Sequence, residues 1–290
     1  MIYCAGYASG LAGTDQSIGL GPLLIEKSVK DNTSIQWLNH FYPKHINEKS
    51  DLLPVIQDCC EKLAQQVHYL VKQKKTFSVV GGDHSVAIGT WSGAAAACEE
   101  PLELIWFDAH MDAHTFMTSA SKNIHGMPVS VLLGHGEESL VNIMTSQPKI
   151  QAQNIHLIGI RDFQDEEKQF LDDLNVNIIY MDEIRKKGIN TIIQHLIEQI
   201  KSKGNKVGIS IDLDVIDPLF APGVCTGAKD GMSDENLIEA FTKLITSFKD
   251  NLLGIEIAEY NPNNDQDDRT LEIAKKILTV FASLYEKDNA

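Results

Sequence analysis

The chain has 290 residues, 43% of them hydrophobic and 7% aromatic, which is enough for one large globular domain with a substantial core. Forty acidic and 25 basic residues give a formal net charge of -15, which argues against nucleic acid or an anionic membrane surface as a partner. No apolar stretch approaches the length of a membrane span, and the first six residues predict a strand and no signal peptide.

Strand and helix patterns alternate along the whole chain. Strands are predicted at residues 1–6, 35–38, 77–80, 104–107, 155–159, 176–181, 207–211 and 253–258. Helices are predicted at residues 52–72, 166–174, 191–201, 234–248 and 268–285. This alternation predicts an α/β fold, in which helices cover both faces of a parallel sheet. Because no repeat or linker divides the sequence, we expect a single domain over residues 1–290.

The cysteines predict free thiols. There are five of them, an odd number, and none shows C-x-x-C spacing: Cys4, Cys59, Cys60, Cys98 and Cys225. Most lie in apolar stretches, as reduced cysteines of a cytoplasmic protein do.

Four of the predicted strands end in carboxylates and histidines. His84 follows strand 77–80, Asp108, His110 and Asp112 follow strand 104–107, Asp212 and Asp214 follow strand 207–211, and Glu259 follows strand 253–258. The carboxyl ends of parallel strands share one edge of a sheet, where ligands bind. So many carboxylates would repel one another unless cations neutralised them, so the pattern predicts a metal site.

The spacing within two of these segments favours a site for two ions. Asp108, His110 and Asp112 occupy alternate positions, and so do Asp212 and Asp214. An extended backbone sends alternate side chains to the same side, so each set would face one point. Four carboxylates and two imidazoles suit an oxygen-rich, octahedral ion such as Mn²⁺ better than the sulfur-rich sites of structural zinc.

Simpler explanations exist for each segment alone. An Asp-x-Asp pair after a strand is also typical of a magnesium-phosphate site or a helix cap, and His84 after two glycines equally suits a turn. The coincidence of three such strand ends favours the metal site. Six further histidines lack this context and are predicted to be surface or core residues: His40, His45, His68, His135, His156 and His195.

Several longer motifs resemble those of the arginase (ureohydrolase) family, and they stand in the same order. They are Gly82-Asp83-His84-Ser85, Asp108-Ala109-His110-Met111-Asp112, His125-Gly126-Met127-Pro128, Ser210-Ile211-Asp212-Leu213-Asp214 with Asp217-Pro218, and Glu259-Tyr260-Asn261-Pro262. The resemblance extends from Gly19-Leu20-Gly21-Pro22 over nearly the whole chain. It implies a three-layer α/β/α sandwich with a mainly parallel, eight-stranded sheet, and commonly homotrimers or homohexamers.

The resemblance also implies a binuclear manganese centre, although other divalent first-row metals are compatible with the same ligands. One ion would be held by His84, Asp108, Asp112 and Asp212, and the other by His110, Asp108, Asp212 and Asp214. Asp108 and Asp212 would bridge the two ions.

The implied reaction is hydrolysis of a guanidinium group, whose carbon resists attack by neutral water. Two metal ions sharing a water lower its pKa from about 16 to about 7 and so supply hydroxide near neutral pH. His125 resembles the family's proton shuttle, and Glu259 resembles the carboxylate that fixes the substrate guanidinium. With Asp112, these are the residues that we expect to be catalytic.

The expected substrate is arginine. Ser121 and Asn123 resemble the family's serine and asparagine that bind the amino acid carboxylate, which agmatine lacks. Both residue types are also common in turns, so an ordinary loop remains the alternative. His114, Thr226 and Glu167 complete the expected substrate-binding set. His114 would contact the carboxylate, and the alternative is a solvent-facing loop histidine.

Three departures from the family's pattern affect the outer pocket and leave the metal ligands intact. His114 stands where arginases usually have asparagine, and Gln164 stands where an aspartate binds the amino group. The loop 223–231 replaces the usual Gly-Thr-Gly-Thr-Pro and Gly-Gly loop and keeps only Thr226, at the position expected to line the guanidinium site.

We therefore expect hydrolysis of L-arginine to L-ornithine and urea. The alternatives within the family are agmatinase, guanidino-acid hydrolase and formiminoglutamase. A non-catalytic metal-binding or regulatory subunit is a further alternative, which the complete set of six ligands with His125 and Glu259 argues against.

Overall fold

The computed structural model describes residues 1–44 and 52–286, and His45 therefore lies outside the described residues. Eight strands form one sheet: β1 (Ile2–Tyr7), β2 (Ile35–Phe41), β3 (Phe77–Gly81), β4 (Leu102–Phe107), β5 (Ile155–Ile160), β6 (Asn177–Tyr180), β7 (Lys206–Asp212) and β8 (Leu252–Ala258). Their order is β2-β1-β3-β8-β7-β4-β5-β6. Every neighbouring pair is parallel, so the sheet is wholly parallel where we expected a mainly parallel one.

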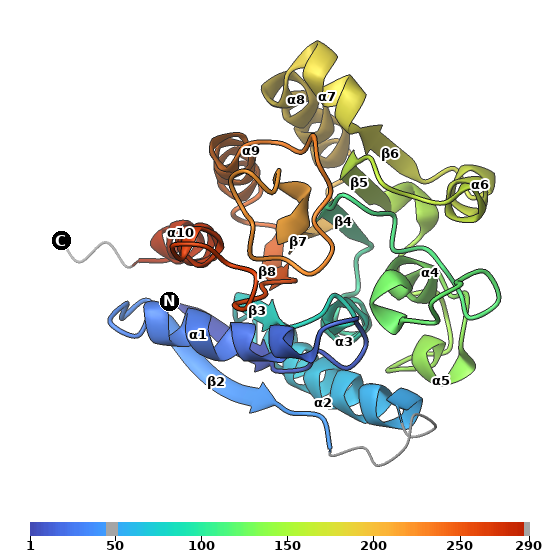
Figure 1. Ribbon diagram of the computed structural model, residues 1–290, viewed down its shortest axis with the longest axis horizontal. Coiled ribbons are helices and arrows are strands. Elements are labelled where there is room, and N and C mark those ends of the chain that lie inside the picture. Colours follow the sequence, from blue (N-terminus) through green and yellow to red (C-terminus); the bar gives the residue numbers. More distant parts are fainter. Residues whose placement is uncertain (45–51, 287–290) are drawn as a thin grey trace.

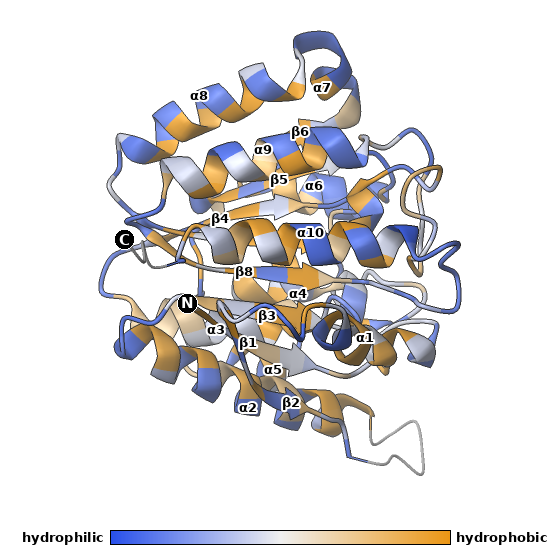
Figure 2. Ribbon diagram, turned by 90° about the vertical axis from the view of Figure 1, so that its left-hand side faces the viewer, coloured by the Kyte–Doolittle hydropathy of each residue, from blue (hydrophilic) through white to orange (hydrophobic). Residues whose placement is uncertain are grey.

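Helices cover both faces of this sheet (Figure 1). They are α1 (Gly21–Ser28), α2 (Leu52–Lys72), α3 (Val86–Ala97), α4 (Pro128–Leu132), α5 (Glu138–Val141), α6 (Asp165–Asp173), α7 (Met181–Lys187), α8 (Ile189–Lys201), α9 (Asp234–Ser247) and α10 (Arg269–Ser283). Helices α1 and α7 to α10 pack on one face, and α2 to α6 pack on the other. The strands between them are mainly hydrophobic (Figure 2). The expected three-layer α/β/α sandwich is confirmed.

Two further expectations can be compared with the structure. All five cysteines have free thiols. Within residues 1–44 and 52–286, no helix is long and apolar enough to cross a membrane.

All eight predicted strands and all five predicted helices are present, with bounds that differ by a few residues. The prediction missed α1, α3, α4, α5 and α7. Most of these helices are short, but α3 has 12 residues and was missed for another reason. It is buried on nearly all sides, so its sequence lacks the alternation of polar and apolar faces on which the prediction relied.

Helix α3 matters to the site because it begins two residues after His84. It packs very closely on α2 through two glycines one turn apart. A Cβ on Gly93 would lie 2.2 Å from the carbonyl oxygen of Ala64, and one on Gly89 would lie 2.7 Å from that of Cys60. The close approach of the two backbones therefore depends on glycine at both positions.

We expect Gly93→Ala to destabilise the protein although alanine is the better helix former. The gain in helix propensity is about 1 kcal/mol, whereas overpacking costs about 1–3 kcal/mol, and here the obstructing atom belongs to backbone. Urea unfolding followed by circular dichroism measures the difference. Ala95→Ser, at a half-buried position of the same helix, is the control and should change stability by less than about 0.5 kcal/mol. A Gly93→Ala protein as stable as the parent would contradict this account of the helix contact.

Candidate active site

The four strands that end in carboxylates and histidines are neighbours in the sheet, in the order β3-β8-β7-β4. Because all of them run in parallel, their carboxyl ends meet at the same edge, as predicted. This edge brings together His84 after β3, Glu259 after β8, Asp212 at the end of β7, and Asp108 after β4.

The imidazole of His84 lies at the centre of a first cluster. Its Nδ1 atom is 3.0 Å from Asp212 Oδ2, 3.2 Å from Asp112 Oδ2 and 3.3 Å from Asp108 Oδ2. His84 and these three carboxylates are all at least nine-tenths buried. Donor atoms of His84, Asp108 and Asp212 lie within 4.8 Å of one another, an arrangement that can hold a metal ion.

A second cluster shares Asp108 with the first. His110 Nδ1 is 3.0 Å from Asp214 Oδ2 and 3.5 Å from Asp108 Oδ1. The donor atoms of these three residues also lie within 4.8 Å of one another. The two clusters therefore bring together all six residues that the sequence predicted as ligands, with Asp108 common to both.

The backbone conformation that brings these six residues together differs from the expected one. The segment from Asp108 to Asp112 is a loop after the end of β4, and Asp112 has a φ of 48°, which an extended strand excludes. Asp214 lies in a 3₁₀ turn after β7. The carboxylates of Asp108 and Asp212 accept hydrogen bonds from the backbone N–H groups of His110 (2.7 Å) and Asp214 (2.8 Å). The side chains converge because of these local turns, and the strand alternation that we assumed is wrong.

Ser210 and Glu256 support His84, although the sequence predicted a role for neither of them. His84 Nε2 lies 3.0 Å from Ser210 Oγ, which in turn donates to Glu256 Oε1 at 2.8 Å. Ser210 and Glu256 are direct partners in the ladder between β7 and β8. Since the serine hydroxyl donates to the carboxylate, it accepts from His84, which places the proton on Nε2 and leaves Nδ1 free as a ligand. An acidic residue inside a buried strand was the available signal for Glu256.

The electrostatics of the clusters fit divalent cations. His84 Nδ1 and Asp214 Oδ2 are buried, and their close contacts with Asp212 and His110 lack the geometry of a hydrogen bond. Burial and the neighbouring charge of Asp108 raise the pKa of Asp112 to about 7. Burial and the charges of Asp214 and Asp108 raise the pKa of Asp212 well above its usual range. Cations coordinated by these atoms would satisfy the unpartnered groups and remove the repulsion, and the oxygen-rich donor set suits ions such as Mn²⁺.

His125 and Glu259 form a pair beside the clusters. His125 Nδ1 lies 3.2 Å from Glu259 Oε1, which also accepts a hydrogen bond of 2.8 Å from the backbone N–H of His84. Burial alone would lower the pKa of His125, but the contact with Glu259 outweighs it and raises the pKa to about 9. Glu259 has a φ of 69°, and its buried Oε2 atom has no hydrogen-bond partner.

A cavity of about 220 Å³ opens onto His125 and the clusters, whereas Glu259 lies behind its wall and is buried. Its lining includes His110, Asp112, Asp212, His125, His114, Glu167 and Thr226, all predicted site residues, together with Gln164. Ser121 and Asn123 are not among the lining residues. Ser121 is exposed, and its hydroxyl accepts a 3.2 Å hydrogen bond from the backbone N–H of Asn123 in the adjoining loop.

The outer part of this cavity contains a close pair of His114 and Glu167. His114 Nε2 is 3.1 Å from Glu167 Oε2, and both side chains are about nine-tenths buried. Glu167 also accepts hydrogen bonds from the backbone N–H groups of Ala113 (3.1 Å) and Gln164 (3.2 Å). The glutamate therefore has few free acceptor positions for a ligand.

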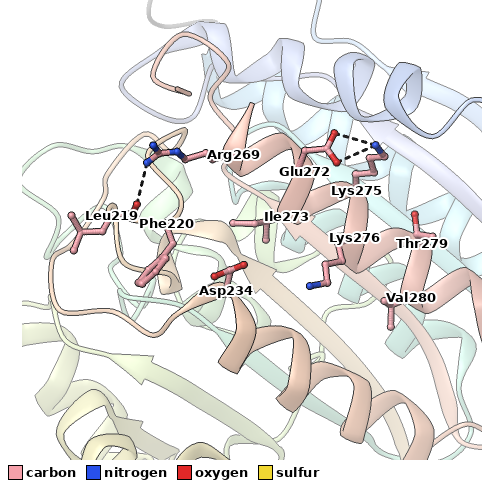
Figure 3. Close-up of a pocket in the computed structure, with 10 residues that line it drawn as sticks. All are labelled: Leu219, Phe220, Asp234, Arg269, Glu272, Ile273, Lys275, Lys276, Thr279 and Val280. Carbon is pink, nitrogen blue, oxygen red and sulfur yellow. Dashed lines mark hydrogen bonds and ion pairs between the residues drawn. The ribbon is translucent and has the colours of Figure 1, made fainter. Parts of the chain in front are cut away.

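A larger cavity of about 710 Å³ lies elsewhere, along α10 and the segment of Leu219 and Phe220 (Figure 3). None of the predicted site residues lines it. Of the other histidines, His156 is buried and 2.8 Å from Glu103, His40 is 2.7 Å from Glu26, and His195 is exposed, as expected for core and surface residues.

The sequence and the fold of the chain are similar to those of known proteins. The Arginase family matches residues 15–283. The chain is 38% identical over 218 residues to an arginase of Bacillus subtilis, which is 75% of this chain and 72% of the relative. It is 36% identical over 233 residues to an arginase of Bacillus caldovelox, covering 78% and 75%.

Solved structures of arginases have the same fold as this chain. The crystal structure of the Bacillus subtilis arginase superposes with a TM-score of 0.88 at 32% identity, covering 97% of this chain and 98% of that one. The Bacillus caldovelox arginase superposes with a TM-score of 0.89 at 31% identity, covering 100% and 99%. The chain therefore belongs to the arginase family.

Proposed function

We propose that the chain hydrolyses L-arginine to L-ornithine and urea, as a single catalytic domain that uses two metal ions. The observation that carries the proposal is the pair of overlapping donor clusters, joined by Asp108, beside the His125–Glu259 pair, of which His125 lines the same cavity. Similarity to proteins named arginase supports arginine as the substrate. The complete ligand set argues against a non-catalytic subunit.

The six clustered residues would hold the ions, which we propose to be Mn²⁺. One ion would bind His84, Asp108, Asp112 and Asp212, and the other His110, Asp108, Asp212 and Asp214. When bound, such a pair supplies hydroxide near neutral pH by lowering the pKa of a shared water. The Ser210–Glu256 pair fixes the His84 ring, so the ligand atom already points at the carboxylates.

Glu259 and His125 would act on the substrate. A carboxylate offers two oxygens in a plane, which matches a guanidinium, and the buried Oε2 atom of Glu259 makes no hydrogen bond that this contact would have to break. The contact with Glu259 raises the pKa of His125 to about 9, which favours the protonated imidazole that would give a proton to the leaving amine. Asp112 would contribute to catalysis through its contact with His84, with which it would share one ion.

The outer part of the cavity would select the end group of the substrate. We assign substrate contacts to His114, Glu167 and Thr226, which line the cavity, and to Ser121 and Asn123 on the adjoining loop. The His114–Glu167 pair also favours a second candidate, a guanidino acid without an amino group. Because Glu167 is already held by His114 and two backbone N–H groups, it is less available to an ammonium group. Agmatine and formiminoglutamate are the remaining family substrates to be tested.

The oligomeric state, the compartment and the kinds of partner complete the proposal. We propose a homotrimer or homohexamer in the cytoplasm, in line with the family resemblance and the free thiols. The net charge of -15 disfavours nucleic acid as a partner, and we propose no membrane partner.

Asp212→Asn should lower metal content and activity together, because the aspartate would bridge both ions and loses its charge at both. Metal analysis of the manganese-loaded protein should find fewer than two ions per chain. His110→Asn should weaken mainly one ion. Asp250→Asn, at an exposed acidic position, is the matched control and should keep both. Two tightly held ions in Asp212→Asn would contradict the bridging assignment.

His125→Asn should lower turnover by about 10²- to 10⁴-fold, the usual contribution of a general acid, with both ions retained. Glu259→Gln should instead mainly raise KM, because a charge-assisted contact becomes a neutral one. Steady-state kinetics with parallel metal analysis separates the two effects. Full turnover of His125→Asn across the pH range would assign the proton transfer to another group.

Urea release from L-arginine, agmatine and 4-guanidinobutyrate tests the substrate. If the outer contacts receive an amino acid end group, arginine should exceed agmatine by a large factor, since polar groups arranged around a carboxylate lose their partner when it is absent. Ser121→Ala with Asn123→Ala should narrow that gap, while Ser139→Ala, away from the cavity, should not. Faster hydrolysis of guanidinobutyrate than of arginine would replace arginine with the guanidino acid.

A further inference from the structure

The chain contains only three arginines, Arg161, Arg185 and Arg269, among its 25 basic residues. All three donate hydrogen bonds to backbone carbonyls of one segment, which runs from Asp214 to Asp230 after β7. This segment includes the loop 223–231, in which the sequence departs from the family's pattern.

Arg161 makes most of these contacts. Its Nη2 atom donates to the carbonyls of Asp214 at 2.7 Å and Ala228 at 2.8 Å, and its Nε atom donates to that of Lys229 at 3.0 Å. Nη1 donates to the carbonyl of Gly159 on β5 at 3.1 Å. The guanidinium of Arg161 therefore connects three parts of the chain: the end of β5, the turn that contains the predicted metal ligand Asp214, and the loop 223–231.

Arg185, which lies on α7, contacts the next residue of the same loop. Its Nη2 atom donates to the carbonyl of Asp230, and its Nη1 atom lies 2.9 Å from Asp182 Oδ1. Three consecutive carbonyls, those of Ala228, Lys229 and Asp230, are thus bound by two arginines. Arg269 makes one longer contact of 3.4 Å with the carbonyl of Leu219, which belongs to the same segment but lies outside the loop 223–231 (Figure 3).

The loop has little regular structure of its own to hold it. Around it the structure has two isolated bridges, between Ile216 and Met232 and between Val224 and Tyr260. Gly231 gives Arg161 its space, because a Cβ there would lie 2.7 Å from Nη2. Two residues before Ala228 is Thr226, which lines the substrate cavity.

We propose that Arg161 and Arg185 are positioning residues that hold the loop 223–231, so that Thr226 keeps its place in the cavity wall. The part concerning the cavity rests on the proposed function. Lysine cannot replace them, since the guanidinium presents several donors in a fixed plane whereas an ammonium is a single point on a flexible stem.

Limited trypsin digestion of the manganese-loaded protein tests the contact directly. Lys229 is exposed in the loop, so cleavage after it reports how often the loop detaches. Arg161→Lys keeps the charge and the tryptic site at position 161. It should raise the rate of cleavage after Lys229 by about tenfold or more, because several charge-assisted hydrogen bonds are lost. Arg185→Lys should raise it less, since one contact with the loop is lost.

Matched variants make the result specific. Arg269→Lys loses only the distant 3.4 Å contact and should leave cleavage after Lys229 unchanged. Adding Lys229→Gln to Arg161→Lys should abolish the new fragment. Circular dichroism and metal analysis should show a folded protein with both ions, and KM should rise severalfold while kcat changes less.

The outcomes separate the two proposals. Cleavage of folded Arg161→Lys and Arg185→Lys at the parent rate would overturn the positioning role. Faster cleavage with an unchanged KM would overturn the link to the cavity. A parent protein that hydrolyses no guanidino compound would refute the proposed function, and the cleavage rates would still decide whether the arginines hold the loop.

Discussion

The repulsion among four buried carboxylates is the constraint on which the rest of the site depends. Asp108, Asp112, Asp212 and Asp214 converge on two imidazoles where little water reaches them. The cost of burying so much like charge appears as raised pKa values and as polar atoms without partners. A fold that maintains this arrangement needs cations to stabilise it, and this need links the fold to its chemistry.

The order of the strands makes the convergence possible. Residues far apart in the sequence meet because β3, β8, β7 and β4 are neighbours that all end at one edge. The same register supplies the support behind the ligands, since Ser210 and Glu256 are ladder partners. Helix α3 fixes the chain directly after His84 by its close contact with α2. The metal-facing side chains therefore depend on the rigid layers of the sandwich.

Local sequence signals predicted the strands and the six clustered residues, because each strand is a short apolar run and each ligand follows one. The same signals did not predict how the ligands converge. Asp112 needs a positive φ and Asp214 a tight turn, which are set by hydrogen bonds after the strand ends. Helix α3 was missed because it is buried all round, and Glu256 was missed because it lies within a buried strand instead of after it.

The residues of the outer pocket are held in place differently from the predicted metal ligands. Most of the pocket residues lie on loops, although Glu167 lies on α6. The hydroxyl of Ser121 contacts Ser119 and the backbone N–H of Asn123, and we propose that the place of Thr226 depends on contacts made by Arg161 and Arg185. A motif in the sequence specifies residue types, but it does not specify which carbonyls a guanidinium from another strand will bind. The predicted metal ligands are therefore positioned by the ends of the strands, whereas the proposed substrate contacts lie mainly on loops, whose geometry becomes evident only in the folded chain.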